Sequence, residues 1–134
     1  LTDRDAAGRP TRFGLITTWD HTSWFPVMIT RQWGAPLFNA EGTRCIIDAP
    51  QAADAFRFAQ RLMYDARVMP TPADEAAMAN AGGWGGGALT LFGGGRGATA
   101  IGYRWWLVVL RQPEFAGLNL GVVPLPETPG GAIE

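Results

Sequence analysis

The chain has 134 residues and a formal net charge of −1, with 47% hydrophobic and 17% charged residues. This length predicts one domain that buries roughly two-thirds of its unfolded surface. All 11 basic residues are arginine, and no block of like charge occurs. The composition therefore argues against a nucleic-acid partner, which needs a clustered basic face, and it excludes a lysine nucleophile or a phosphate-binding P-loop lysine.

The single cysteine, Cys45, lies in an apolar run with Ile46 and Ile47. We expect it to be a small buried hydrophobe, with a reactive thiol as the alternative. The longest apolar segment, 105–110, is far too short to span a bilayer, and no signal peptide or lipidation motif is found. If the protein is exported, we expect its signal to lie outside this sequence.

The first third of the chain predicts one strand, one helix and one hairpin. Residues 1–10 have the polar character of a helix tail followed by a loop, and the β-branched and aromatic content of 11–18 predicts a strand. Ser23 can cap a helix that continues to Trp33, because Gly34 follows as a stop signal. A polar, glycine-bearing turn within 36–47 then predicts a hairpin.

An amphipathic helix is the clearest element of the sequence. Asp48 is placed to cap it, and Pro50 lies in its first turn. We expect the helix to end before Pro70 and to serve as scaffold. Apolar residues recur at helical spacing and predict its buried face, namely Ala52, Phe56, Ala59, Met63 and Ala66.

The second half of the chain mixes short elements with glycine-rich loops. Thr71 or Asp74 can cap a short helix over 73–79, and 82–87 is expected to be loop. Periodicity does not separate helix from strand for 88–92. A buried strand over 98–101, a helix start over 105–111 and a final strand over 118–123 complete the expected elements. Alternating strands and helices predict an α/β sandwich.

The sequence gives only weak support for a catalytic site, a nucleotide-binding site or a metal site. GGGRGA at 93–98 matches a dinucleotide-binding pattern, but the residues after it favour a strand where that motif requires a helix. His21 neighbours Asp20 and Ser23, but side chains on one short loop seldom form an oriented catalytic relay. One histidine, one cysteine and no carboxylate cluster predict no metal site. We therefore expect no enzyme and no cofactor.

Aromatic and arginine residues gather near the ends of the predicted strands, where ligands bind in open α/β sheets. Tryptophan rings stack on the apolar face of a sugar, and Asp20 and Arg104 can bind its hydroxyls, each stacking contact contributing on the order of 1 kcal/mol. A core position remains the alternative for Trp84, Trp105 and Trp106. The candidate ligand-binding residues are Trp105, Arg104, Trp106, Trp19, Asp20, Trp24 and Trp84.

A series of short motifs resembles the bacterial extracellular solute-binding proteins of ABC sugar importers. The motifs keep the family's order and cover nearly the whole chain. They are GRPTRFGL (8–15), WFP (24–26), GAPLF (34–38), IDAPQAADAF (47–56), FGGGR (92–96), GYRW (102–105) and GVVPLP (121–126).

Members of that family have two α/β lobes that trap a ligand between them. The resemblance implies that 1–134 form a single α/β lobe, most of the carboxy-terminal one, with a small mixed sheet flanked by helices in a periplasmic-binding-protein-like fold. It implies a helix over 88–92 and a sugar or oligosaccharide ligand stacked on Trp105, with Arg104 and Trp106 beside it. Trp19, Asp20 and Trp24 would line the same cleft.

The resemblance also implies partners and a location. It implies docking onto ABC permease subunits and an extracellular or periplasmic location, with a membrane tether in the full-length protein. The alternative is a protein-interaction or structural domain whose exposed tryptophans meet another chain, including a copy of itself. Convergence of Trp19, Trp24 and Trp105 on one concave wall favours a small ligand, whereas a scattered arrangement favours a partner.

Overall fold

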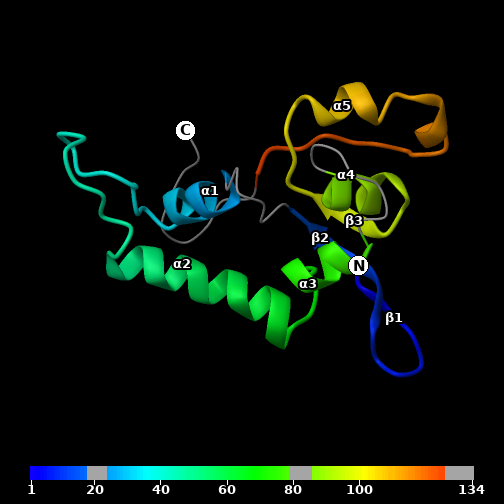
Figure 1. The fold of residues 1–134 in the computed structure, drawn as a ribbon, viewed down its shortest axis with the longest axis horizontal. Helices are drawn as coiled ribbons and strands as arrows, with labels where there is room; N and C mark the ends of the chain where they lie inside the picture. The colour runs from blue at the N-terminus through cyan, green and yellow to red at the C-terminus, as the bar shows by residue number, and fades with distance from the viewer. Residues whose placement is uncertain (18–23, 79–85, 126–134) are drawn as a thin grey trace.

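A small mixed sheet with helices packed around it forms the fold (Figure 1). The computed structural model describes residues 1–17, 24–78 and 86–125. Within these residues the sheet has the order β1-β2-β3, in which β1 (Asp3–Arg4) is antiparallel to β2 (Pro10–Ile16) and β3 (Gly97–Ala100) is parallel to it. The strands predicted over 11–18 and 98–101 are thus confirmed with slightly shifted ends.

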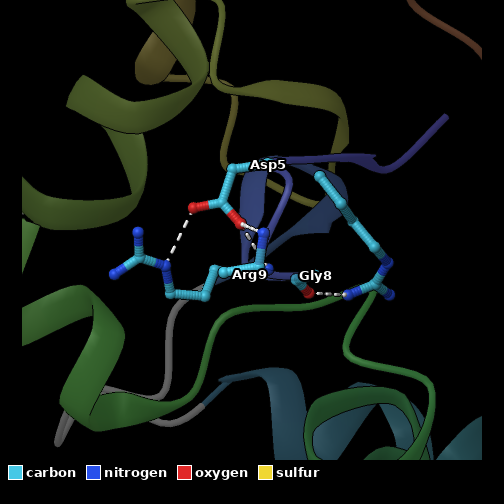
Figure 2. Close-up of polar contacts among 5 residues, drawn as sticks. Asp5, Gly8 and Arg9 are labelled. Atoms are coloured by element: carbon cyan, nitrogen blue, oxygen red, sulfur yellow. Dashed lines mark hydrogen bonds and ion pairs between the residues drawn. The ribbon is translucent and has the colours of Figure 1, made fainter.

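A tight hairpin joins β1 to β2, so the expected helix tail over 1–10 is wrong. The carboxylate of Asp5 accepts hydrogen bonds from the backbone N–H groups of Ala7 and Arg9, each at 2.9 Å, and from Nε of Arg9 at 2.8 Å (Figure 2). Gly8 completes the turn with a φ of +76°, which glycine adopts without strain. The backbone hydrogen bond from Arg9 is the largest cause that lowers the pKa of Asp5.

Arg4 fastens this hairpin to the rest of the molecule. Its guanidinium donates to the carbonyl of Gly8 at 3.3 Å and to the carbonyl of Ala66 at 2.8 Å. Ala66 lies directly after the helical segment that ends at Asp65. The cation therefore satisfies a carbonyl at a helix C-terminus, where positive charge is favoured.

β2 and β3 approach each other closely. Phe13 pairs with Gly97 and Ile16 with Ala100. A Cβ on Gly97 would collide with the side chain of Ile16. Gly97 therefore lets the two strands pair while Ile16 stays fully buried.

The helix-rich half consists of α1 (Trp24–Gln32), α2 (Pro50–Gln60) and a π-helical turn, η1 (Arg61–Asp65). Both predicted helices are confirmed, and α1 packs against α2. Asp48 does not cap α2, because Ala49 occupies the N-cap and makes no side-chain hydrogen bond. The predicted buried face needs correction as well. Its buried members are Ala52, Ala55, Ala59 and Met63, whereas Phe56 is half-buried and Ala66, beyond the helix end, is exposed.

The expected hairpin over 36–47 is reduced to a single antiparallel bridge between Phe38 and Cys45. Asn39 closes the turn, since its Oδ1 accepts the backbone N–H of Thr43 at 2.8 Å. The connection projects from the rest of the fold beside α1 and α2 (Figure 1). Cys45 is exposed, so the expectation of a buried cysteine is wrong, and its bridge partner Phe38 is exposed as well.

The two short helices of the middle segment form as predicted. In α3 (Pro72–Met78), the hydroxyl of Thr71 accepts the N–H of Asp74 at 3.1 Å, and the Asp74 carboxylate accepts the N–H of Thr71 at 2.9 Å. This reciprocal pair is a capping box. Residues 88–92 lie in α4 (Gly86–Gly93), as the resemblance implies. The loop expected over 82–87 is wrong for Gly86 and Gly87, which already belong to α4.

The end of the described chain holds α5 (Trp106–Val109), a one-turn helix, and η2 (Pro113–Phe115), a 3₁₀ turn. The final strand predicted over 118–123 is wrong: residues 118–125 have no strand assignment. The described sheet, β1-β2-β3, does not include this segment. Val122 and Val123 are consequently 77% and 82% exposed.

Two hydrophobic clusters form the core, and β2 contributes to both. The sheet-side cluster joins β2, α4 and α5. The helix-side cluster joins α1, α2 and η1 with the segment after η1, and Leu15 packs against it. The buried members of the sheet-side cluster are Phe13, Ile16, Ala88, Leu89, Leu91, Trp106 and Leu110. Those of the helix-side cluster are Ile29, Ala55, Ala59, Met63 and Met69.

Candidate functional site

The candidate site lies on the segment 103–111, which follows the carboxyl end of β3 and contains α5 (Figure 1). A tight turn leads into the helix, since the backbone N–H of Trp106 donates to the carbonyl of Tyr103 at 2.9 Å. The N–H of Val108 donates to the carbonyl of Trp105 at 3.0 Å. These bonds hold several large side chains at one sheet edge, where ligands bind in α/β folds.

Tyr103 and Trp105 form a stacked aromatic pair. Their ring planes are 8° apart and their centroids 6.3 Å apart, which is an offset parallel arrangement. Trp105 remains 38% exposed, while Tyr103 is half-buried against the sheet-side cluster. We call this pair the aromatic platform. It gives a flat ligand a rigid ring whose orientation is set from beneath.

Trp106 points the other way and is core. Adjacent residues of a helix project about 100° apart, so one indole can face solvent while its neighbour is buried. Trp106 is 3% exposed and meets Trp105 edge-on, with ring planes 73° apart. Gly102 makes room for it, since a Cβ there would lie 2.6 Å from Cε3 of the indole. The buried ring thus supports the platform from below.

The indole N–H of Trp106 has no hydrogen-bond partner among the described residues. A buried donor without a partner destabilises the fold by roughly 1–3 kcal/mol. Its ring nevertheless packs in the sheet-side cluster, where Leu110 lies four residues later on the same helical face. Packing rather than hydrogen bonding therefore holds Trp106 in place.

An open hollow of about 680 Å³ lies next to the platform. Its lining contains no acidic side chain and consists of Arg104, Trp105, Leu107, Val108 and Arg111. Across residues 1–17, 24–78 and 86–125, neither Arg104 nor Arg111 has a side-chain hydrogen bond or an ion pair. The hollow therefore combines one aromatic face, aliphatic walls and two guanidinium groups whose donors are not used by any side-chain contact among the described residues.

The expected convergence of Trp19, Trp24 and Trp105 on one concave wall stays a prediction. Trp19, Asp20 and Trp84 lie outside the described residues, as does His21. Trp24 begins α1, and only its backbone is described. The structure brings Arg104 and Trp105 together at one hollow and places Trp106 beneath them.

Sequence reasoning missed four residues of this site as candidates: Tyr103, Leu107, Val108 and Arg111. The sequence does contain a signal for Tyr103. An aromatic side chain two residues before Trp105 can contact the Trp105 ring when the chain turns between them. Arg104 precedes α5 and Arg111 follows it, so helical spacing does not relate the two residues. The turns on either side of α5 bring them to the same hollow, and the sequence pattern does not predict those turns.

No helix of the described segments has the length and apolar character needed to cross a bilayer. No group of three or more His, Cys, Asp or Glu side chains is placed there to hold a metal ion.

The comparisons with known proteins point to one fold. No protein-family model matches the chain, and no curated protein matches its sequence. Among solved structures, the chain is similar to an ABC substrate-binding protein from Listeria monocytogenes, determined in complex with cycloalternan, with a TM-score of 0.61 and 20% sequence identity. The match covers 80% of this chain and 24% of that one. The small mixed sheet and its helices therefore have the fold of part of a periplasmic-binding-protein-like chain.

Proposed function

We propose that residues 1–134 form one lobe of the substrate-capture component of an ABC importer and bind a sugar or oligosaccharide at the hollow beside Trp105. The observation that carries this proposal is the aromatic platform, a parallel pair of rings held at a sheet edge next to an open hollow. The likeness to a substrate-binding protein determined with an oligosaccharide supports it.

The chemistry of the hollow suits a sugar. A pyranose presents a flat C–H face to the exposed ring of Trp105, which contacts Tyr103 in a parallel arrangement and Trp106 edge-on. Hydroxyl groups of the sugar can accept hydrogen bonds from Arg104 and Arg111. The contacts of Trp105 with Tyr103 and Trp106 are already made without ligand, and preformed contacts of this kind lower the entropic cost of capturing a ligand.

The free-energy contributions of the individual contacts explain why a single lobe binds its ligand weakly. One stacking contact contributes about 1 kcal/mol, and each hydrogen bond to a charged donor contributes about 1.5–3 kcal/mol. Binding also costs several kcal/mol in lost translational and rotational freedom. The favourable contributions reach about 4–7 kcal/mol before this cost, so the wall alone reaches millimolar affinity at most, which requires about −4 kcal/mol. In the proposed protein a second lobe closes over the hollow and supplies the remaining contacts, and the closed form docks onto the permease outside the cytoplasm.

A titration of this chain with neutral oligosaccharides tests the proposal. We expect tryptophan fluorescence and NMR signals to change at millimolar ligand, and Trp105→Ala to abolish the response. Tyr64→Ala is the matched control, because Tyr64 is an exposed ring on η1, away from the hollow. Unchanged binding by Trp105→Ala, or an equal loss in Tyr64→Ala, would contradict the proposal.

Exposed aliphatic residues support a second candidate, a protein-interaction domain. Val108 is 72% exposed, and Val122 and Val123 are more exposed still. Apolar side chains grouped at a surface mark contact sites for other chains. Light scattering across a concentration series separates the two functions. A dimer that Val122→Ser with Val123→Ser dissociates, combined with no response to any saccharide, would favour the interaction domain.

A further inference from the structure

Two arginines that have no counter-ion within the described part of the chain line the same hollow. Arg104 and Arg111 are both exposed, and neither makes an ion pair among the described residues. Glu114, the acidic residue nearest to Arg111 in the sequence, is exposed and makes no ion pair with it. The lining itself contains no carboxylate. The hollow is therefore a local excess of positive charge in a chain whose net charge is −1.

Guanidinium groups in such a setting favour an anion over a hydroxyl. Arginine binds a carboxylate through two parallel N–H···O bonds, and such charged hydrogen bonds are roughly twice as strong as neutral ones. Its charge is weakly hydrated, which lowers the cost of removing water on binding. Leu107 and Val108, which lie between the two arginines in the sequence, also line the hollow and add an apolar surface beside the guanidinium groups. A neutral sugar would use only part of this donor capacity.

We infer that the ligand of this hollow is an acidic saccharide, whose pyranose ring stacks on Trp105 while its carboxylate pairs with Arg104 and Arg111. This inference rests on the proposed function and narrows its substrate class to uronate-containing oligosaccharides. The aromatic ring recognises the sugar face, and the two cations recognise the acid. The site therefore requires both features on one ligand.

A matched pair of ligands tests the inference directly. A trigalacturonate and its methyl ester differ in charge but keep the same sugar skeleton. We expect the acid to bind this chain at least fivefold more tightly than the ester, with an advantage that shrinks as salt is raised because added ions screen the attraction. Sodium acetate is the third probe, and we expect it to bind at least tenfold more weakly than the acid.

Variants assign the preference to the two arginines. Arg104→Gln combined with Arg111→Gln is expected to reduce the acid-to-ester preference to about one. Both ligands should bind more weakly than in the wild type, because the sugar hydroxyls lose the guanidinium donors, and the comparison is made from the Trp105 signal at correspondingly higher ligand concentration. Arg44→Gln is the matched control, since Arg44 is an exposed arginine on the 36–47 connection. We expect it to retain the preference.

Each of the other possible outcomes contradicts either the acidic-saccharide inference alone or that inference together with the proposed function. Equal binding of acid and ester, or a preference that persists in the double variant, overturns the acidic-saccharide inference and leaves the proposed function standing. Acetate that binds as tightly as trigalacturonate overturns it as well, since the sugar ring would then contribute nothing. Absence of binding by both acid and ester, in a chain whose NMR spectrum shows it folded, overturns the inference and the saccharide-binding function together.

Discussion

The sheet-side cluster and the helix-side cluster are built differently. The helix-side cluster packs two alanines and two methionines with Ile29, so its centre is made of small and flexible side chains. The sheet-side cluster contains Trp106, a large rigid ring in a one-turn helix seated against glycine. Only the sheet-side cluster lies next to the hollow, because Trp106 contacts the ring of Trp105 edge-on.

This difference indicates in which cluster the stability of the fold and the binding of a ligand at the hollow are coupled. In the sheet-side cluster the same indole fills the core and orients the aromatic platform, so a change there should affect both properties. No residue that lines the hollow belongs to the helix-side cluster or packs against it. A change there should lower stability and leave the platform as it is. The predictions below separate the two regions on that basis.

The largest expected effect is that of Trp106→Ala. Removing a buried tryptophan leaves a cavity, and such changes lower the free energy of unfolding by about 3–5 kcal/mol. That loss is a large fraction of the stability of a small domain. We expect the variant to unfold at much lower urea, and to bind saccharide poorly even where it is folded. A Trp106→Ala chain with near-native stability would contradict the coupling.

Met63→Ala provides the counterpart in the helix-side cluster. Met63 is buried on η1, and truncation should lower the free energy of unfolding by about 2–5 kcal/mol. We expect saccharide binding, measured at a temperature where the variant is folded, to match the wild type within twofold. A larger loss of binding would show that the two regions are not separable.

Gly102→Ala should act on the same coupling with a smaller effect. The added methyl group would lie 2.6 Å from the Trp106 ring, which cannot bend away as a flexible side chain can. Overpacking of this kind costs about 1–3 kcal/mol. We expect a lower urea midpoint and a changed Trp105 NMR signal. Gly117→Ala is the control, since nothing lies within 4 Å of a Cβ at that position.

The smallest effect is expected in the β1–β2 hairpin, through Asp5→Asn. Backbone and side-chain hydrogen bonds from Arg9 lower the pKa of Asp5 in the folded chain. A carboxylate with a lowered folded pKa stabilises the fold above its unfolded pKa of about 3.9, and this contribution is lost as the pH falls through the folded value. The wild type should therefore exceed the variant in stability at pH 7, with the two converging near pH 2. A constant difference in urea midpoint over that range would contradict the prediction.

Local patterns predicted much of the fold. β-branched content located β2, and helical periodicity with Pro50 located α2. Local sequence patterns gave wrong predictions where an element forms only by pairing with or packing against another element. β1 exists because Asp5 and Gly8 turn the chain back onto β2, whereas the apolar stretch 118–123 lies outside the described sheet. Cys45 was also predicted wrongly: an apolar run in the sequence does not show whether its segment packs against the core, and both residues of the Phe38–Cys45 bridge are exposed.

The candidate site was predictable only in part. The cluster of rings after β3 was visible in the sequence, but the different environments of Trp105 and Trp106 were not. Which indole becomes core depends on where the single turn of α5 begins and on the space left by Gly102. Arg111 was missed because its place at the hollow depends on the turns on either side of α5.

A single NMR titration addresses saccharide capture at the aromatic platform most directly. Indole N–H signals of ¹⁵N-labelled chain would be assigned through individual Trp→Phe variants and followed as oligosaccharide is added. Trp33 packs against Phe58 beside the helix-side cluster and serves as an internal reference. We predict a saturable shift of the Trp105 signal, a smaller one for Trp106 and none for Trp33. A Trp105 signal that stays fixed for both neutral and acidic saccharides would contradict the proposed function.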